Sequence, residues 1–87
     1  MTYEIRIARD AAAYLHRLDP RTRRRMLDRL DQIAGDPFGP HTKPLTGGRG
    51  QRAARVGTWR IIFTVDTTSR VVDVSDNGPR GDIYRRL

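Results

Sequence analysis

The residues of this chain that are best suited to chemistry stand on either side of a two-residue turn. Within Ala54–Phe63, Gly57 and Thr58 separate two strand-like stretches, and a Gly-X pair is typical of a type II′ hairpin. Such a hairpin places Arg55 directly opposite Arg60, where like charges normally destabilise a ladder by a few tenths of a kcal/mol. Because arginine binds phosphate through two parallel hydrogen bonds, the facing pair indicates an anion site.

Side-chain alternation along the two stretches sorts their residues onto two faces. Arg55 and Arg60 share one face. The other face is apolar and is expected to pack against helices; it consists of Ala54, Val56, Trp59, Ile61, Phe63 and Val65. The structural alternative for the two arginines is solvation, or pairing with the carboxylates of Asp66, Asp73 or Asp82, and the sequence leaves that alternative open.

The C-terminal segment adds a third arginine and a tyrosine to these candidates. Arg80 and Tyr84 follow the last strand-like stretch. If Gly78 and Pro79 turn the chain back over the sheet, both side chains reach the face that carries the strand arginines. The alternative for Tyr84 is a ring that covers the sheet edge with its hydroxyl in water.

The charge balance favours a polyanionic partner. Across 87 residues, 17 Lys and Arg oppose 10 Asp and Glu, a formal net charge of +7, and Lys43 is the only lysine. A GC-rich genome is a second explanation for the choice of arginine over lysine. The chain has no cysteine, which excludes disulfides and thiolate metal sites and favours a reducing cytoplasm. No apolar run approaches the roughly 18–20 residues of a membrane helix, so no membrane partner is expected.

Two helices are expected to position the candidate site. Apolar residues recur at helical spacing over Arg9–Leu18 and again over Asp19–Gly35. In the second helix Asp19 is the expected cap, Pro20 suits the first helical position, and Gly35 is a suitable left-handed stop. The connection is so short that the two helices are expected to fold back as an antiparallel hairpin.

The strands are expected to form one sheet beneath these helices. Alternation predicts strands over Tyr3–Ile7, Gln51–Val56, Trp59–Asp66 and Arg70–Ser75, with a hairpin turn between the last two. Asp36–Gly50 is rich in proline and glycine, which predicts a long loop. The order β-α-α-β-β-β predicts a single α+β domain over residues 1–87, with the helical hairpin packed on a mostly antiparallel, four-stranded twisted sheet.

Five short patterns follow one another along the chain. They are a Tyr-x-Ile opening strand, Leu-Asp-Pro between the helices, Lys-Pro-Leu after them, ARVGTWRIIFTVD, and a closing GPRGDIYR. Together they resemble the RelE/ParE superfamily of toxins from toxin–antitoxin systems, and the RelE-like mRNA interferases most closely. The resemblance implies a RelE-like fold and a ribosome-dependent endoribonuclease that cuts mRNA in the ribosomal decoding site. It also implies a co-expressed, RelB-like antitoxin, which is expected to be acidic.

The resemblance further implies roles for four individual residues. Arg60 occupies the position of the strand arginine that grips the scissile phosphate, and Arg55 matches a basic position on the preceding strand. Arg80 falls on the tail arginine, a phosphate ligand or proton donor to the leaving oxygen. Tyr84 falls on the tail tyrosine, which activates the 2′-hydroxyl or stacks on a base.

This chain departs from the family pattern at two positions. Ala53 stands where the lysine-bearing members have a second basic residue, and Pro79 stands where many relatives have histidine. Arg52 is adjacent to the first gap, but alternation turns it to the other face unless a bulge re-aims it. Both departures remove candidate proton-transfer groups.

Other basic residues are expected to contact RNA. They are Arg52, Arg49, Lys43, Arg25, Arg29 and Arg85. For those in the second helix, a solvated face is the alternative to contact with ribosomal RNA phosphates.

The implied reaction needs no metal and no cofactor, because RNA carries its own nucleophile. Attack by the 2′-hydroxyl gives a 2′,3′-cyclic phosphate and a 5′-hydroxyl, and the enzyme must align the hydroxyl, stabilise charge and move two protons. Tyrosine and arginine have reference pKa values of about 10 and above about 12, so proton transfer is slow. This favours an enzyme that depends on the ribosome to distort its RNA.

Alternative functions remain open at this level. A ParE-like DNA gyrase inhibitor is one, and a catalytically weak toxin homologue that acts through antitoxin binding and promoter autoregulation is another. His16 and His41 are too isolated to form an acid–base pair. A metal-dependent nuclease is disfavoured, because Asp76, Asn77 and Gly78 read more naturally as a turn.

Overall fold

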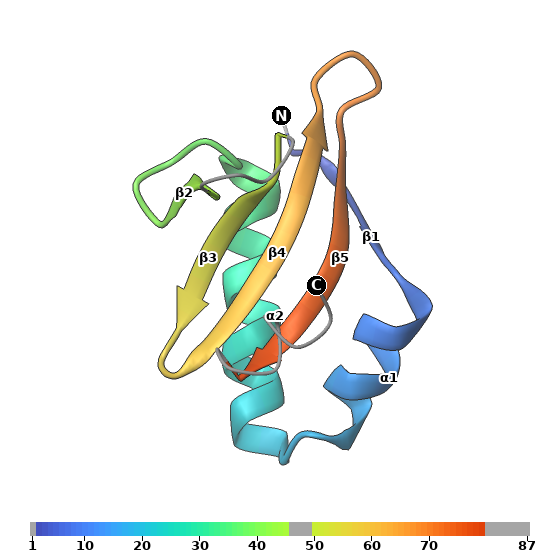
Figure 1. Cartoon of the computed structure of the whole chain (residues 1–87), viewed down its shortest axis with the longest axis vertical. Coiled ribbons are helices and arrows are strands. Elements are labelled where there is room, and N and C mark those ends of the chain that lie inside the picture. The colour runs from blue at the N-terminus through green and yellow to red at the C-terminus, as the bar shows by residue number, and fades with distance from the viewer. Residues whose placement is uncertain (1, 46–49, 80–87) are drawn as a thin grey trace.

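The computed structural model describes residues 2–45 and 50–79 as two helices and a five-stranded sheet (Figure 1). The elements in chain order are β1 (Glu4–Ile7), α1 (Arg9–Arg17), α2 (Pro20–Gly35), β2 (Thr42–Pro44), β3 (Arg52–Val56), β4 (Trp59–Asp66) and β5 (Val71–Pro79). The strand order in the sheet is β1-β5-β4-β3-β2. β1 runs parallel to β5, and every other neighbouring pair is antiparallel.

The α+β class and the order of the expected elements are confirmed, but the expected number of strands is wrong. Thr42–Pro44 lies within the predicted loop and adds a fifth strand at the edge of the sheet, paired with Arg52–Ala54. The Leu45 N–H then donates to the Gln51 carbonyl at 2.9 Å. Proline is tolerated here because an edge strand need not donate on its outer side.

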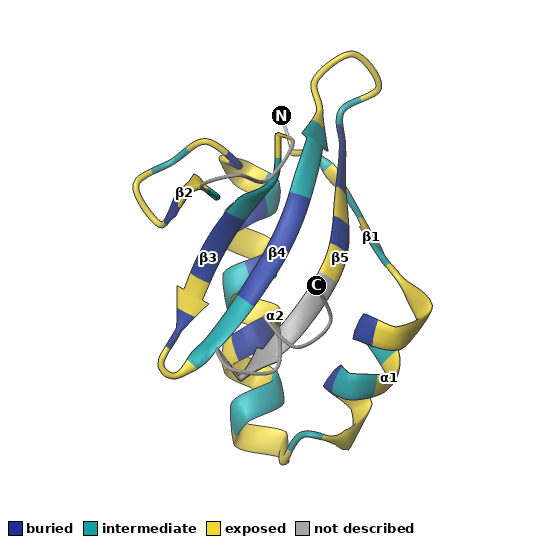
Figure 2. Cartoon of the chain, in the orientation of Figure 1, coloured by how far each residue is buried: buried dark blue, intermediate teal, exposed yellow. Residues whose placement is uncertain are grey.

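The hydrophobic core lies between one face of the sheet and the two helices (Figures 1 and 2). Its buried members come from both helices and the three long strands: Ala11, Leu15, Met26, Leu30, Ile33, Ala54, Val56, Ile61, Phe63, Val72 and Val74. Trp59 and Val65 pack against this cluster, which confirms the predicted apolar face of the hairpin. Neither α1 nor α2 covers the opposite face of the sheet, and we call it the open face.

The ends of the helices match the expected caps with one exception. The Asp19 carboxylate accepts a hydrogen bond from the Thr22 N–H at 3.1 Å, and Pro20 occupies the first turn. Gly35 is not a left-handed stop: α2 ends there and Asp36 is extended, with its N–H on the Gln32 carbonyl at 3.0 Å. Because a backbone bond already satisfies that carbonyl, the helix terminates without a positive φ.

Arg23 of α2 joins the two helices. Its guanidinium donates to the His16 carbonyl at 3.0 Å and the Leu18 carbonyl at 2.8 Å, with a longer bond of 3.4 Å to Leu15. These carbonyls lie at the C-terminal end of α1, where the last carbonyls of a helix lack i+4 partners, and that of Leu15 also accepts from the Leu18 N–H at 3.2 Å. A single side chain therefore caps α1 and fixes the short connection to α2.

β5 is longer than predicted and contains a bulge. Phe63 pairs with Val74 whereas Ile62 pairs with Asp76, so Ser75 is an extra residue between them. The Ser75 hydroxyl donates to the Ile62 carbonyl at 3.3 Å. The interpretation of residues 76–78 as a turn is wrong, because they continue the ladder with β4 to Pro79. Ladder pairing with a long neighbouring strand overrides the local turn preference.

No helix in the described ranges, 2–45 and 50–79, is long and apolar enough to cross a membrane.

Candidate anion-binding site

The β3–β4 hairpin places the two candidate arginines side by side. Arg55 is the ladder partner of Arg60, and Val56 is the partner of Trp59, as the hairpin prediction requires. Gly57 opens the turn with φ +61°. A side chain at Gly57 would be strained at that φ and would also approach the Arg25 guanidinium to 3.2 Å.

Both arginines lie on the open face, next to a small apolar floor. Arg55 is exposed and Arg60 is half-buried. One row along the sheet, Ala53 and Ile62 are buried and Leu45 packs against them. Apolar surroundings of this kind reduce competition by water, so that a bound anion is held more strongly than on an open polar surface.

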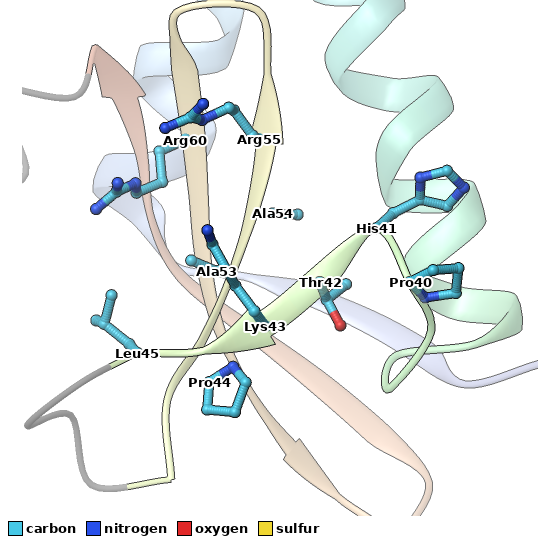
Figure 3. A pocket seen from close by; sticks show the side chains of 10 residues that line it. All are labelled: Pro40, His41, Thr42, Lys43, Pro44, Leu45, Ala53, Ala54, Arg55 and Arg60. Carbon is cyan, nitrogen blue, oxygen red and sulfur yellow. The ribbon is translucent and has the colours of Figure 1, made fainter.

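A cavity of about 280 Å³ opens over this part of the sheet (Figure 3). It is lined by Pro40, His41, Thr42, Lys43, Pro44, Leu45, Ala53, Ala54, Arg55 and Arg60. Three of these residues are cations, and they come from three different strands. The size is sufficient for a phosphate group with part of its nucleotide, and small relative to the roughly 300–1,000 Å³ of enclosed small-molecule pockets.

Lys43 and His41 enter the cavity because residues 42–44 form a strand. A proline- and glycine-rich loop gave no sequence signal for that placement. Figure 3 shows Lys43 extending over Ala53 on the side where Arg55 and Arg60 lie, while His41 lies at the other end of the cavity. His41 is exposed and directly precedes β2, with β3 between it and the strand of Arg60.

Of the three carboxylates predicted as alternative partners, Asp66 and Asp73 form no salt bridge with Arg55, and Asp82 lies outside the described residues. Asp66 instead accepts hydrogen bonds from the N–H groups of Thr68 and Ser69 at 3.0 and 3.1 Å in the β4–β5 turn. These hydrogen bonds, of which those from Ser69 have the largest effect, hold the pKa of the Asp66 carboxyl below its usual value. Asp73 is the ladder partner of both Arg6 and Thr64, and thus lies two rows from the arginine pair.

Arg52 is not part of the open-face cluster. Its guanidinium donates to the Thr42 hydroxyl at 2.9 Å and to the Pro37 carbonyl at 3.2 Å, and it lies 5.1 Å from the Phe38 ring centroid. Alternation already turns this residue away from the arginine face, and the bulge that would re-aim it is absent from β3. Arg52 holds the 37–42 segment against the sheet.

Two arginines of α2 lie close to the hairpin turn. Arg25 and Arg29 line a shallow hollow of about 200 Å³ with Val56 and Gly57. Gly57 also lines a second hollow with Arg55 and Arg60 on the other side of the turn. Basic side chains therefore flank the hairpin tip on both sides.

The remaining predicted site residues, Arg49, Arg80, Tyr84 and Arg85, lie outside the described residues. The chain leads toward three of them along β5, where Gly78 is the ladder partner of Arg60 and Pro79 that of Trp59. Within the described ranges, no group of three or more His, Cys, Asp or Glu side chains is arranged to hold a metal ion.

The sequence profile of the ParE toxin of the type II toxin–antitoxin system parDE matches residues 5–84. A search of curated protein sequences finds no match.

Solved structures with the same fold include toxins bound to their antitoxins. The RelBE2 toxin–antitoxin complex of Mycobacterium tuberculosis superposes with a TM-score of 0.79 at 25% identity, covering 92% of this chain and 100% of that chain. The archaeal RelE–RelB complex of Pyrococcus horikoshii gives 0.79 at 28%, covering 93% and 98%. A free arginine-to-alanine mutant of E. coli RelE gives 0.81 at 18%, covering 98% and 93%, and shows the fold alone.

Proposed function

Because this chain belongs to the ParE toxin family, within the RelE/ParE superfamily of type II toxins, we propose that its open face binds and cleaves RNA. The proposed reaction is a metal-free transesterification of mRNA in the ribosomal decoding site. The 2′-oxygen bonds to phosphorus, the bond to the 5′-oxygen breaks, and the products are a 2′,3′-cyclic phosphate and a 5′-hydroxyl.

The observation that carries this proposal is the facing pair Arg55 and Arg60 beside the cavity. Two like charges that face each other across a ladder repel by a few tenths of a kcal/mol. A phosphate between them relieves the repulsion and accepts bidentate hydrogen bonds. In the transition state the phosphorane carries more negative charge than the substrate, so this pair stabilises the transition state more than the ground state.

Proton transfer is assigned to the C-terminal segment. In this proposal Arg80 protonates or binds the leaving oxygen, and Tyr84 activates the 2′-hydroxyl or stacks on a base. Arginine is a poor acid at neutral pH and tyrosine a poor base, so the chemical step is slow unless the substrate is already distorted. Dependence on the ribosome results, because the ribosome supplies the alignment that the protein cannot.

Contacts to the wider RNA are proposed for the remaining basic residues. Arg25 and Arg29 flank the hairpin tip and suit ribosomal RNA phosphates, and Arg49 and Arg85 keep their predicted RNA contacts. Arg52 acts on RNA only indirectly in this proposal, by supporting β2 from the other side of the sheet.

An acidic, RelB-like antitoxin is the proposed protein partner. The net charge of +7 favours an acidic partner, and similar structures from M. tuberculosis, P. horikoshii and E. coli were solved as RelBE or RelE–RelB complexes. Binding over the open face would cover the arginine pair and block RNA. Translating ribosomes are the proposed site of action, which places the active protein in the cytoplasm.

Inhibition of DNA gyrase is the second candidate function. The matching family profile is that of ParE, which favours this alternative directly. Retention of the paired strand arginines, with the tail arginine and tyrosine in the sequence, favours RNA cleavage instead. A weakly catalytic toxin that acts mainly by binding its antitoxin and controlling its promoter is a third candidate, because Ala53 supplies no basic group.

Primer extension on a defined mRNA tests the proposal. Purified protein is added to programmed ribosomes, with Arg60→Ala, Arg80→Ala and Tyr84→Phe run beside the wild type and naked mRNA as the control. Cuts in the decoding site that fade in the three variants support the interferase. If ribosomes and free RNA both stay intact while DNA supercoiling by gyrase is inhibited, the gyrase candidate replaces it. If neither activity appears, the antitoxin-binding candidate remains.

A further inference from the structure

Next to the arginine pair on the open face, β3 has a residue without a charged side chain, Ala53. On the open face, Arg55 pairs with Arg60, and two residues further along the ladder Ala53 pairs with Ile62. Ala53 is buried and contributes only a methyl group, so β3 supplies no second cation to the cavity. An anion held by the arginines therefore has an apolar floor on one side, and Arg55 is the one cation that β3 contributes to the cavity lining.

Lys43 lies directly across the ladder from that position. β2 and β3 are antiparallel, and their register pairs Lys43 with Ala53. Facing residues in such a pair have Cβ atoms about 4.5–5.5 Å apart, a gap that the four-carbon stem of lysine spans. Figure 3 shows the amine end of Lys43 above Ala53, on the side of the strands that bears Arg55 and Arg60.

The strand that carries Lys43 is held firmly in place. Thr42 is buried, and its hydroxyl donates to the Pro37 carbonyl at 2.9 Å while accepting from Arg52 at 2.9 Å. On the other side of Lys43, the Leu45 N–H bonds to Gln51. Because hydrogen bonds anchor Thr42 before it and Leu45 after it, the backbone at Lys43 is held in place, and only the lysine side chain must be ordered when a ligand binds.

The amine of Lys43 is available to a ligand. The residue is exposed, and no salt bridge of the described residues includes it: these pairs are Arg6 with Glu4 and Arg24 with Asp28, both away from the cavity. An ammonium group is a compact charge with three donors, whereas the guanidinium groups beside it are planar. It can therefore contact a phosphate oxygen that the two arginines leave free.

We propose that Lys43 is a phosphate ligand of this site, and that it supplies from β2 the cation that Ala53 cannot supply from β3. The inference rests on the proposed function in one respect, since it takes RNA phosphate as the anion. It adds a residue from a different strand to the site and makes β2 a functional element.

The test measures RNA binding separately from cleavage. A short, fluorescently labelled, fully 2′-O-methylated RNA cannot undergo the reaction, and its affinity is followed by anisotropy over a series of salt concentrations. In a plot of log K against log salt concentration, loss of one phosphate contact to a single strand reduces the magnitude of the negative slope by about 0.7. We expect that decrease and about fivefold weaker binding for Lys43→Gln, and a near-normal slope for Lys43→Arg.

A relocated lysine provides the decisive variant. In Lys43→Ala the slope should fall as in Lys43→Gln, and the double variant Lys43→Ala/Ala53→Lys should recover it, because the two positions face each other. Arg9→Gln is the matched control, since it removes one exposed charge from the first turn of α1, away from the cavity. Thermal unfolding of every variant shows that the fold is retained.

The outcomes separate the two proposals. If Arg55→Gln lowers affinity and slope but Lys43→Gln matches Arg9→Gln, the site binds RNA and the inference about Lys43 is overturned alone. If the relocated lysine fails to recover binding although the double variant is folded, the cross-strand argument is overturned. If the wild type neither binds this RNA nor cuts mRNA on ribosomes, the proposed function fails, and the role of Lys43 fails with it.

Discussion

Replacing Arg55 with glutamine is expected to stabilise the fold while it weakens activity. Arg55 faces Arg60 in the ladder, so the exchange removes a like-charge contact on the open face and keeps most of the side chain. For guanidinium groups about 7 Å apart in water, Coulomb's law gives about 0.6 kcal/mol, and screening at 0.1 M salt reduces it to about 0.3 kcal/mol. A change of that size in a domain of this length raises Tm by about 2 °C.

The assay is thermal unfolding at low and at high salt, paired with cleavage on ribosomes. Arg6→Gln is the matched control, because Arg6 lies on the same sheet but faces Asp73 and bonds to Glu4 at 2.6 Å. Hydrogen bonding to Glu4 raises the pKa of Arg6, and removing this favourable pairing should leave Tm unchanged or lower. The two substitutions are therefore expected to act in opposite directions.

Salt decides whether the electrostatic explanation holds. At about 1 M salt the Debye length is roughly 3 Å, so the gain from Arg55→Gln should disappear. A variant that melts at or below the wild-type temperature in low salt would refute the reasoning. So would a gain that salt leaves unchanged, since that would point to packing or to strand propensity rather than to charge.

Three further predictions concern the scaffold. Arg23→Ala removes three hydrogen bonds to the C-terminal end of α1 and should lower the free energy of unfolding by about 1.5 kcal/mol in urea titration, with Arg23→Lys recovering only part of it. Gly57→Ala forces a side chain into a left-handed φ beside Arg25 and should cost about 1–2 kcal/mol, measured as a lower Tm with unchanged circular dichroism. A hydrogen bond from Thr22 lowers the folded-state pKa of the Asp19 carboxyl, and one from Ser69 lowers that of Asp66. The two carboxylates therefore contribute fully to the free energy of unfolding above about pH 4, and this contribution is lost as the pH falls through their lowered pKa values. The double variant Asp19→Asn/Asp66→Asn should accordingly lose less stability than the wild type between about pH 5 and about pH 2.

Local patterns were sufficient for most of the fold. The alternation around Gly57 predicts both the register of the hairpin and the face that each residue occupies, because a two-residue turn leaves a single pairing available. Asp19 and Pro20 likewise mark the start of α2 correctly. In these cases the residues that determine the structure lie within a few positions of each other.

The parts that the sequence did not predict depend on distant partners. Thr42–Pro44 becomes a strand only because β3 offers it an open edge, and its own composition favours a loop. Lys43 could not be assigned to the arginine cavity until that pairing was known. The extension of β5 beyond Ser75 has the same origin, since the long β4 supplies ladder partners to residues that favour a turn in isolation.

The extra residue, Ser75, shifts the register between β4 and β5 by one position. If the ladder continued without interruption from the Phe63–Val74 pair, Arg60 would pair with Asn77. Because Ser75 is an extra residue, Arg60 pairs with Gly78 instead. The ladder partner of each residue from Ile62 back to Trp59 is thereby displaced by one position along β5. Deleting Ser75 is expected to restore the uninterrupted ladder and make Asn77 the partner of Arg60, so loss of activity with a preserved fold would identify this register as a functional property.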